Sequence, residues 1–135
     1  MFEKIVTITM NPALDATVWL DTVDFAEPNR VRKEKTYAGG KAVNIARVMT
    51  ALGTPVKALG LCGNENARRF FQLLDEDNVS HDFVQVEGIT RENLTLIIPD
   101  GRLLKVNREG FSVSMDTMRG LHKKIEEEIK GVDSV

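Results

Sequence analysis

The pattern that most constrains the fold is an alternation of short apolar runs with amphipathic segments of helical period. The runs at 5–10, 55–62 and 82–86 predict buried strands, and the segments 41–52 and 64–77 between them predict helices. Strands that alternate with helices in this order are joined by right-handed crossovers and form a parallel sheet. The sequence therefore predicts an α/β fold, with a Rossmann-like parallel sheet and flanking helices.

A last helix is expected to begin at Ser114, whose hydroxyl can cap it, and to end at Gly131 before the start of a further strand at 131–135. The run Glu126-Glu127-Glu128 is interpreted as its solvated face. The apolar faces that the three helices are expected to bury are, in chain order, Ala42, Ile45, Ala46, Met49 and Leu52; Ala67, Phe70, Phe71 and Leu74; and Met118, Leu121, Ile125 and Ile129.

Two further pairs of extended segments suggest a second sheet. Segments 17–21 and 31–37 are separated by a turn at 27–29, and the second alternates charged with other residues, as an exposed sheet does. Segments 94–99 and 102–107 flank Asp100-Gly101, a pair typical of a two-residue hairpin turn of type I′.

Composition limits the classes of function. The 135 residues suffice for one domain with a core, and a net charge of −2 with mixed signs argues against a nucleic-acid partner. No apolar run is long enough to span a membrane and no signal peptide is evident, so a cytoplasmic protein with a small-molecule partner is expected. Cys62 is the only cysteine and lies in an apolar run, which predicts a buried, inert thiol.

A glycine turn opens the first helix at Gly39-Gly40-Lys41. The free N–H groups of a helix N-terminus, with the Lys41 ammonium beside them, suit an anion or a polarised hydroxyl, and Asn44 lies one turn along. The alternative is a common turn with a solvated lysine.

Three other polar residues are candidates because of where they lie. Asp15 is expected just past the carboxyl end of the first strand, where open α/β sheets bind ligands, although a turn-capping role is the alternative. Arg91 and Asn93 follow the third strand, where an arginine taken by itself most simply pairs with a surface carboxylate. His81 and His122 have no companions at metal-ligand spacing, so no metal site is predicted.

Together these motifs resemble the PfkB (ribokinase-like) family of carbohydrate kinases, in its phosphofructokinase and tagatose-6-phosphate-kinase branch. The resemblance rests on Asn-Pro-Ala-Leu-Asp at 11–15, Gly-Gly-Lys-Ala-Val-Asn at 39–44, the later Gly53 and Gly63, and Thr-Arg-x-Asn at 90–93. Ala42 departs from close relatives, which often have glycine there.

The resemblance implies that Asp15, Gly39, Gly40, Lys41, Asn44, Arg91 and Asn93 bind the sugar substrate, with Lys105 as a further candidate. Asp15 would hold sugar hydroxyls and Arg91 the phosphate already on the substrate. It also implies a small β-sheet lid, from segments 15–38 and 92–108 of the single domain 1–135, that joins two subunits in a homodimer. Trp19 and Phe25 are candidates for that interface, with ordinary packing as the favoured alternative.

The activity implied is transfer of the γ-phosphoryl group of ATP, with Mg²⁺, to fructose 1-phosphate, fructose 6-phosphate or tagatose 6-phosphate. The family's Gly-Ala-Gly-Asp turn, which supplies the catalytic base, does not occur in the sequence. We therefore expect an amino-terminal portion that binds sugar phosphate weakly at most and does not transfer phosphate. The alternatives are a kinase of an unphosphorylated sugar and a non-catalytic binding or dimerisation module.

Overall fold

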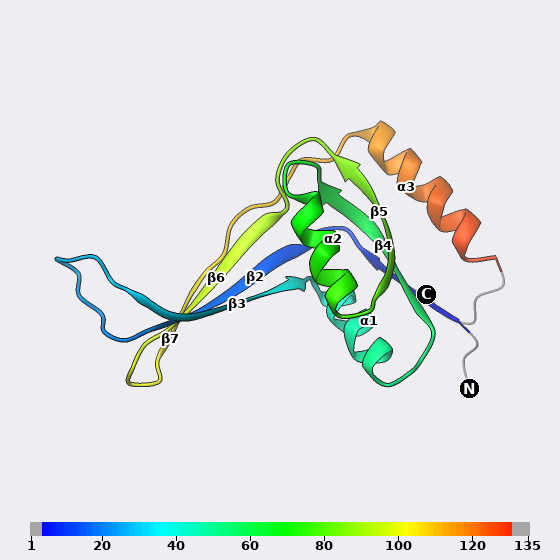
Figure 1. The fold of residues 1–135 in the computed structure, drawn as a ribbon. Helices are drawn as coiled ribbons and strands as arrows, with labels where there is room; N and C mark the ends of the chain where they lie inside the picture. Colours follow the sequence, from blue (N-terminus) through cyan, green and yellow to red (C-terminus); the bar gives the residue numbers. More distant parts are fainter. Residues whose placement is uncertain (1–3, 131–135) are drawn as a thin grey trace.

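The computed structural model describes residues 4–130 and contains two sheets with three helices (Figure 1). The elements are, in chain order, β1 (Ile5–Thr9), β2 (Ala13–Leu20), β3 (Val31–Gly39), α1 (Lys41–Ala51), β4 (Val56–Gly63), α2 (Ala67–Glu76), β5 (Ser80–Val86), β6 (Arg91–Ile97), β7 (Leu103–Val106) and α3 (Met115–Glu128). The expected end of the last helix at Gly131 and the expected strand at 131–135 lie outside the described residues.

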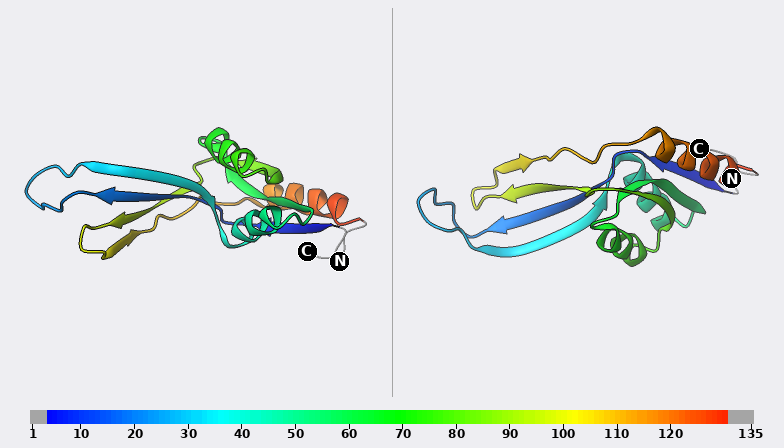
Figure 2. Two further views of the ribbon diagram at one scale, coloured as in Figure 1. Left: turned by 60° about the horizontal axis from the view of Figure 1, so that its bottom comes forward. Right: turned by 90° about the horizontal axis from the view of Figure 1, so that it is seen from above.

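The first sheet is parallel, as the alternation of strands and helices predicted, and its strand order is β1-β4-β5. Ala58 and Cys62 of β4 belong to the core that α1 and α2 cover, whereas Leu61 belongs to a separate cluster with Leu121 of α3. Because neighbouring strand residues point to opposite faces, the helices lie on both sides of the sheet (Figure 2). The predicted α/β architecture is confirmed.

The second sheet has the order β3-β2-β6-β7 and extends away from the helices (Figure 1). We call it the projecting sheet. β2 pairs antiparallel with β3 and parallel with β6, and β6 pairs antiparallel with β7. Its base is packed into the core at Leu14 and Ala38, and no described helix covers the part that projects beyond it (Figure 2).

The position of Asp15 differs from the prediction. The break at Asn11-Pro12 is short, and the chain enters β2 at Ala13, so that Asp15 is a strand residue paired with Tyr37 rather than part of a turn. Its side chain is consequently fixed by the register of the projecting sheet.

The hairpin between β6 and β7 also differs from the prediction. The Gly101 N–H donates to the Ile98 carbonyl at 2.9 Å and the Ile98 N–H to the Arg102 carbonyl at 3.0 Å, which leaves a three-residue loop. A type I′ turn at Asp100-Gly101 needs positive φ at both of these residues. Only Gly101 in this loop has positive φ, so the turn is type I followed by a left-handed glycine.

Two helix faces were predicted only in part, with Ala46 of α1 and Leu121 of α3 buried as expected. In α1 the buried residues are Val43 and Ala46, whereas Ile45 and Leu52 are exposed. In α3 only Leu121 is fully buried, and Met118 and Ile129 are exposed. Both helices present more than one apolar stripe, and the sheet beneath them selects which stripe is covered. The face of α2 is confirmed, with Ala67, Phe70 and Leu74 buried.

The prediction that Glu126-Glu127-Glu128 is a solvated face of α3 is wrong for Glu128. Glu128 accepts hydrogen bonds from Lys57 of β4 and from Lys4, the latter at 3.3 Å. The helix end is therefore tied to the sheet by an ion-pair cluster that sequence spacing does not show.

Candidate functional site

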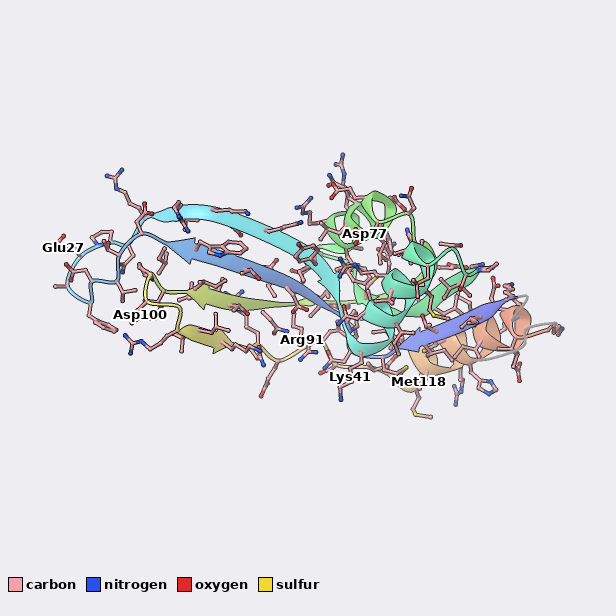
Figure 3. All side chains as sticks on the ribbon, turned by 90° about the horizontal axis from the view of Figure 1, so that it is seen from below. Glu27, Lys41, Asp77, Arg91, Asp100 and Met118 are labelled. Atoms are coloured by element: carbon pink, nitrogen blue, oxygen red, sulfur yellow. The ribbon has the colours of Figure 1, made fainter. Side chains whose placement is uncertain are left out.

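The start of α1 borders a hollow of about 310 Å³ at the junction of the two sheets. Gly40, with φ 121°, precedes the helix without a side-chain cap, and Lys41 begins it. The residues that line the hollow are Ile8, Thr9, Met10, Asn11, Lys41, Ala42 and Arg91. Figure 3 shows Arg91, from β6, and Lys41 at this junction. Two cations and a helix N-terminus thus meet at one hollow, which favours an anionic ligand.

The guanidinium of Arg91 is held by the chain segment between the two sheets. Its Nε donates to the Pro12 carbonyl at 3.3 Å and its Nη2 to the Asn11 carbonyl at 3.4 Å. Both bonds are long, and the described residues 4–130 offer Nη1 no partner. A phosphate can therefore bind at the open Nη1 edge, where charge-assisted bonds are stronger than those to carbonyls.

Asp15 is positioned by Gly39 and Asn93. Its Oδ1 accepts from the Asn93 amide at 3.0 Å, and a Cβ on Gly39 would lie only 2.0 Å from its Oδ2. The side-chain oxygen Oδ1 of Asn93 in turn accepts a hydrogen bond from the Arg108 backbone N–H at 3.2 Å. Asn93 thus uses both ends of its amide within the protein, which orients the Asp15 carboxylate.

Thr9, the last residue of β1, lies at the site although it was not predicted there. It lines the hollow and is 4% exposed, yet its hydroxyl has no hydrogen-bond partner among residues 4–130. A buried unpaired hydroxyl is costly unless a ligand or water satisfies it. Its place at the end of a parallel strand, beside a helix N-terminus, is the sequence signal that could have identified Thr9 as a site residue.

Two predicted site residues lie elsewhere. Asn44 is exposed and lines a separate hollow of about 340 Å³ with Arg47 and Asp77. Lys105 is exposed on β7, opposite Thr95 of β6, and does not line the hollow beside Lys41. The predicted residues therefore form three groups: Gly40 and Lys41 with Arg91, Asp15 with Gly39 and Asn93, and the two outlying residues Asn44 and Lys105.

The chemistry of the described site is binding and orientation. Within residues 4–130 no three His, Cys, Asp or Glu side chains cluster as metal ligands. Cys62 is buried, as predicted, and burial raises the pKa of its thiol to about 12, which keeps it protonated and inert. None of the described helices is long and apolar enough to cross a bilayer.

Sequence comparison relates the chain to sugar kinases. A family model described as pfkB family carbohydrate kinase matches residues 5–115. The 1-phosphofructokinases of Vibrio cholerae and Escherichia coli are each 35% identical over 114 residues, which cover 84% of this chain and 36% of each relative. The chain thus spans little more than a third of the length of these relatives.

Structure comparison agrees. A crystal structure of phosphofructokinase-2 from Escherichia coli in complex with substrates and products has a TM-score of 0.85 at 25% identity, over 95% of this chain and 42% of that chain. A Thermotoga maritima protein described as a possible 1-phosphofructokinase has a TM-score of 0.85 at 26% identity, over 96% of this chain and 42% of that chain.

Proposed function

Because this chain belongs to the pfkB family of carbohydrate kinases, we propose that it forms the sugar-binding part of an ATP-dependent kinase whose substrate is a phosphorylated ketohexose. The observation that carries the substrate class is the convergence of Arg91 and Lys41 on the hollow at the start of α1. The similar 1-phosphofructokinases are consistent with fructose 1-phosphate as the first substrate to test.

In this proposal each site residue binds one part of the sugar phosphate. Arg91 and Lys41 bind its phosphate, and Asp15, fixed by Gly39 and Asn93, accepts hydrogen bonds from sugar hydroxyls. Gly40 borders the sugar at the start of α1, whereas Asn44 and Lys105 do not line this hollow and are assigned no contact with the sugar. The contribution of these residues is orientation, which lowers the entropic cost of the reaction.

ATP and Mg²⁺ are the co-substrate and cofactor proposed for the whole enzyme. Residues 4–130 do not contain a fitting set of metal ligands, and we assign no step through the metal to them. Because the Gly-Ala-Gly-Asp turn does not occur in the sequence, we propose that the 135-residue chain binds sugar phosphate weakly at most and does not itself transfer phosphate. Measured ATP-dependent turnover by this chain would disprove that part of the proposal.

The projecting sheet is proposed as the lid and as the interface of a homodimer. Beyond its base no described helix covers either face, and Leu104 and Val106 of β7 are 52% and 43% exposed. These side chains share a face with Leu94 and Leu96, their partners on β6. An exposed apolar sheet face of this kind is typical of an interface.

A kinase of an unphosphorylated sugar is a second candidate. It is favoured by the two carbonyl bonds of Arg91, because these would also suit a guanidinium that only braces the junction. Titration of the chain with fructose 1-phosphate and with fructose, followed by NMR, separates the candidates. We expect tighter binding of the phosphorylated sugar, and loss of that preference in Arg91→Ala. An unchanged preference in Arg91→Ala would refute the phosphosugar assignment.

A further inference from the structure

Asn66 occupies the cap position of α2 but does not cap it. Asparagine is among the best helix caps, since its side-chain oxygen can accept from the free N–H groups of the first turn. Here no side-chain cap bond forms, and the first turn of α2 has no acidic residue. A local rule broken in this way identifies a side chain that is used for something else.

The amide of Asn66 is bonded instead to the backbone of Thr90. Its Nδ2 donates to the Thr90 carbonyl at 2.8 Å, and its Oδ1 accepts from the Thr90 N–H at 2.9 Å. Both backbone groups of one residue are therefore held by one side chain. We call this pair of bonds the Asn66–Thr90 clamp.

The clamp lies where the chain passes from the first sheet into the projecting sheet. Thr90 is fully buried, and its hydroxyl accepts from the Gly63 N–H at 2.8 Å. A Cβ on Gly63 would lie 2.4 Å from the Thr90 nitrogen, so the crossing segment is seated directly against the end of β4. The clamp thus fixes the start of β6 to the turn between β4 and α2.

The residue that follows the clamp is Arg91. Its backbone is in register with Ala13 of β2, and its guanidinium reaches the carbonyls of Asn11 and Pro12. Because those carbonyl bonds are long, they hold the guanidinium weakly by themselves. A rotation of the backbone at Thr90 would move the guanidinium relative to Lys41.

We propose that Asn66 is a positioning residue for Arg91, which it acts on through the backbone of Thr90. Its effect on ligands rests on the proposed function, in which Arg91 binds the substrate phosphate. Asn66 itself contacts no ligand in this arrangement. It sets the separation of the two cations that border the hollow, and with it the preference for a phosphorylated sugar.

Asn66→Ser tests the inference without removing a helix cap. Serine caps helices well, so the variant is expected to fold while losing the clamp. Asn64→Ser is the matched control, since Asn64 lies in the same turn and its side chain bonds the exposed Gly88 N–H at 3.3 Å instead. A second variant, Asn66→Ala, removes both the clamp and the capping capacity.

The first measurement needs no ligand. Hydrogen exchange by NMR on the 135-residue chain reports the Thr90 amide and the Arg91 Nε–H. In Asn66→Ser we expect both to exchange about 10-fold faster or more, because their protecting bonds open more often, and to be unchanged in Asn64→Ser. Unchanged exchange in a folded Asn66→Ser would overturn the inference.

The second measurement compares affinities. Relative to the unsubstituted chain, Asn66→Ser is expected to bind fructose 1-phosphate about 10-fold more weakly. Its affinity for fructose should change less than about twofold, since only Arg91, which binds the phosphate, is misplaced. Equal losses for both sugars would mean a purely structural role and would overturn the inference. If the unsubstituted chain does not prefer fructose 1-phosphate, the proposed function fails, and the exchange of the Arg91 Nε–H still decides whether Asn66 positions that side chain.

Discussion

The carboxylate of Asp15 occupies the space that a side chain at position 39 would need. Gly39→Ala would place a methyl group 2.0 Å from Oδ2 of Asp15, which must rotate and lose its 3.0 Å bond from Asn93. We expect a destabilisation of about 2 kcal/mol, the size of a hydrogen bond to a charged group, and weaker sugar binding. Urea unfolding and NMR titration measure the two effects.

Gly120→Ala is the control for this prediction. Gly120 lies within α3, and apart from the backbone of its own helix and its chain neighbours no heavy atom lies within 4 Å of an added Cβ, so alanine should stabilise the chain by about 0.5–1 kcal/mol. If Gly39→Ala stabilised the chain as Gly120→Ala does, the close approach of Asp15 to position 39 would not contribute to stability.

Thr90 gives a second prediction at the residue scale. Thr90→Val keeps the shape of the side chain but leaves the buried Gly63 N–H without its acceptor, at a cost of about 1–3 kcal/mol. Thr90→Ser keeps the hydroxyl and loses one methyl group, at a cost of about 0.8 kcal/mol. Denaturant unfolding should give the highest free energy of unfolding for the chain with Thr90, a lower one for Thr90→Ser and the lowest for Thr90→Val. A valine variant as stable as the serine variant would contradict this account.

At the scale of elements, α3 is attached to the sheet by charge as much as by apolar contact. Leu121 is its one fully buried side chain in the described part, whereas Glu128 meets Lys57 and Lys4, and Lys124 meets Asp82 at 2.5 Å. The Lys57 ammonium, with a smaller effect from Lys4, holds the pKa of Glu128 below its ordinary value, against the opposing effect of desolvation.

This arrangement predicts an acid-sensitive helix. A carboxylate whose pKa is lowered on folding stabilises the fold above its unfolded pKa, and the contribution is lost as the pH falls through the folded pKa. Glu128→Gln should therefore reduce stability at pH 7 by up to about 1 kcal/mol, and the difference should begin to shrink below the ordinary glutamate pKa of about 4.3 and vanish only at the lower pH at which Glu128 is protonated in the folded chain. Thermal unfolding across this pH range measures it, with Glu127→Gln, an exposed neighbour, as the control that should show no such trend.

At the scale of the whole molecule, the projecting sheet predicts self-association through one of its faces. Leu103 and Leu104 are adjacent on β7 and similarly exposed, at 57% and 52%, but they point to opposite faces. Leu104 lies opposite Leu96 on the proposed interface, and Leu103 lies opposite Ile97 on the other face.

Leu104→Lys is therefore expected to weaken dimerisation about 10-fold or more, because it places a charge within an apolar contact, while Leu103→Lys leaves it nearly unchanged. Sedimentation equilibrium of the two variants measures the effect. The reverse order would assign the interface to the opposite face, and a monomeric unsubstituted chain would refute the dimer.

The order of elements in the first sheet follows from the sequence, because β-branched runs and helical periods are local signals. The seating of α2 follows as well, since Ala67, Phe70 and Leu74 form a single clear stripe. The buried state of Cys62 and the cap at Ser114 are equally local. The motif around Gly39-Gly40-Lys41 led to the family, which the comparisons show; the binding roles of its residues stay predictions.

Tertiary structure decided what depends on distant pairing. Asp15 lies in β2 because β3 and β6 pair with it, α1 turns Val43 rather than Ile45 inward because of the sheet beneath it, and Asn66 leaves its helix cap for a backbone 24 residues away. Pattern within a window specifies which elements form. The partners that compete for a side chain come together only on folding, so the geometry of the site could not be predicted from the sequence.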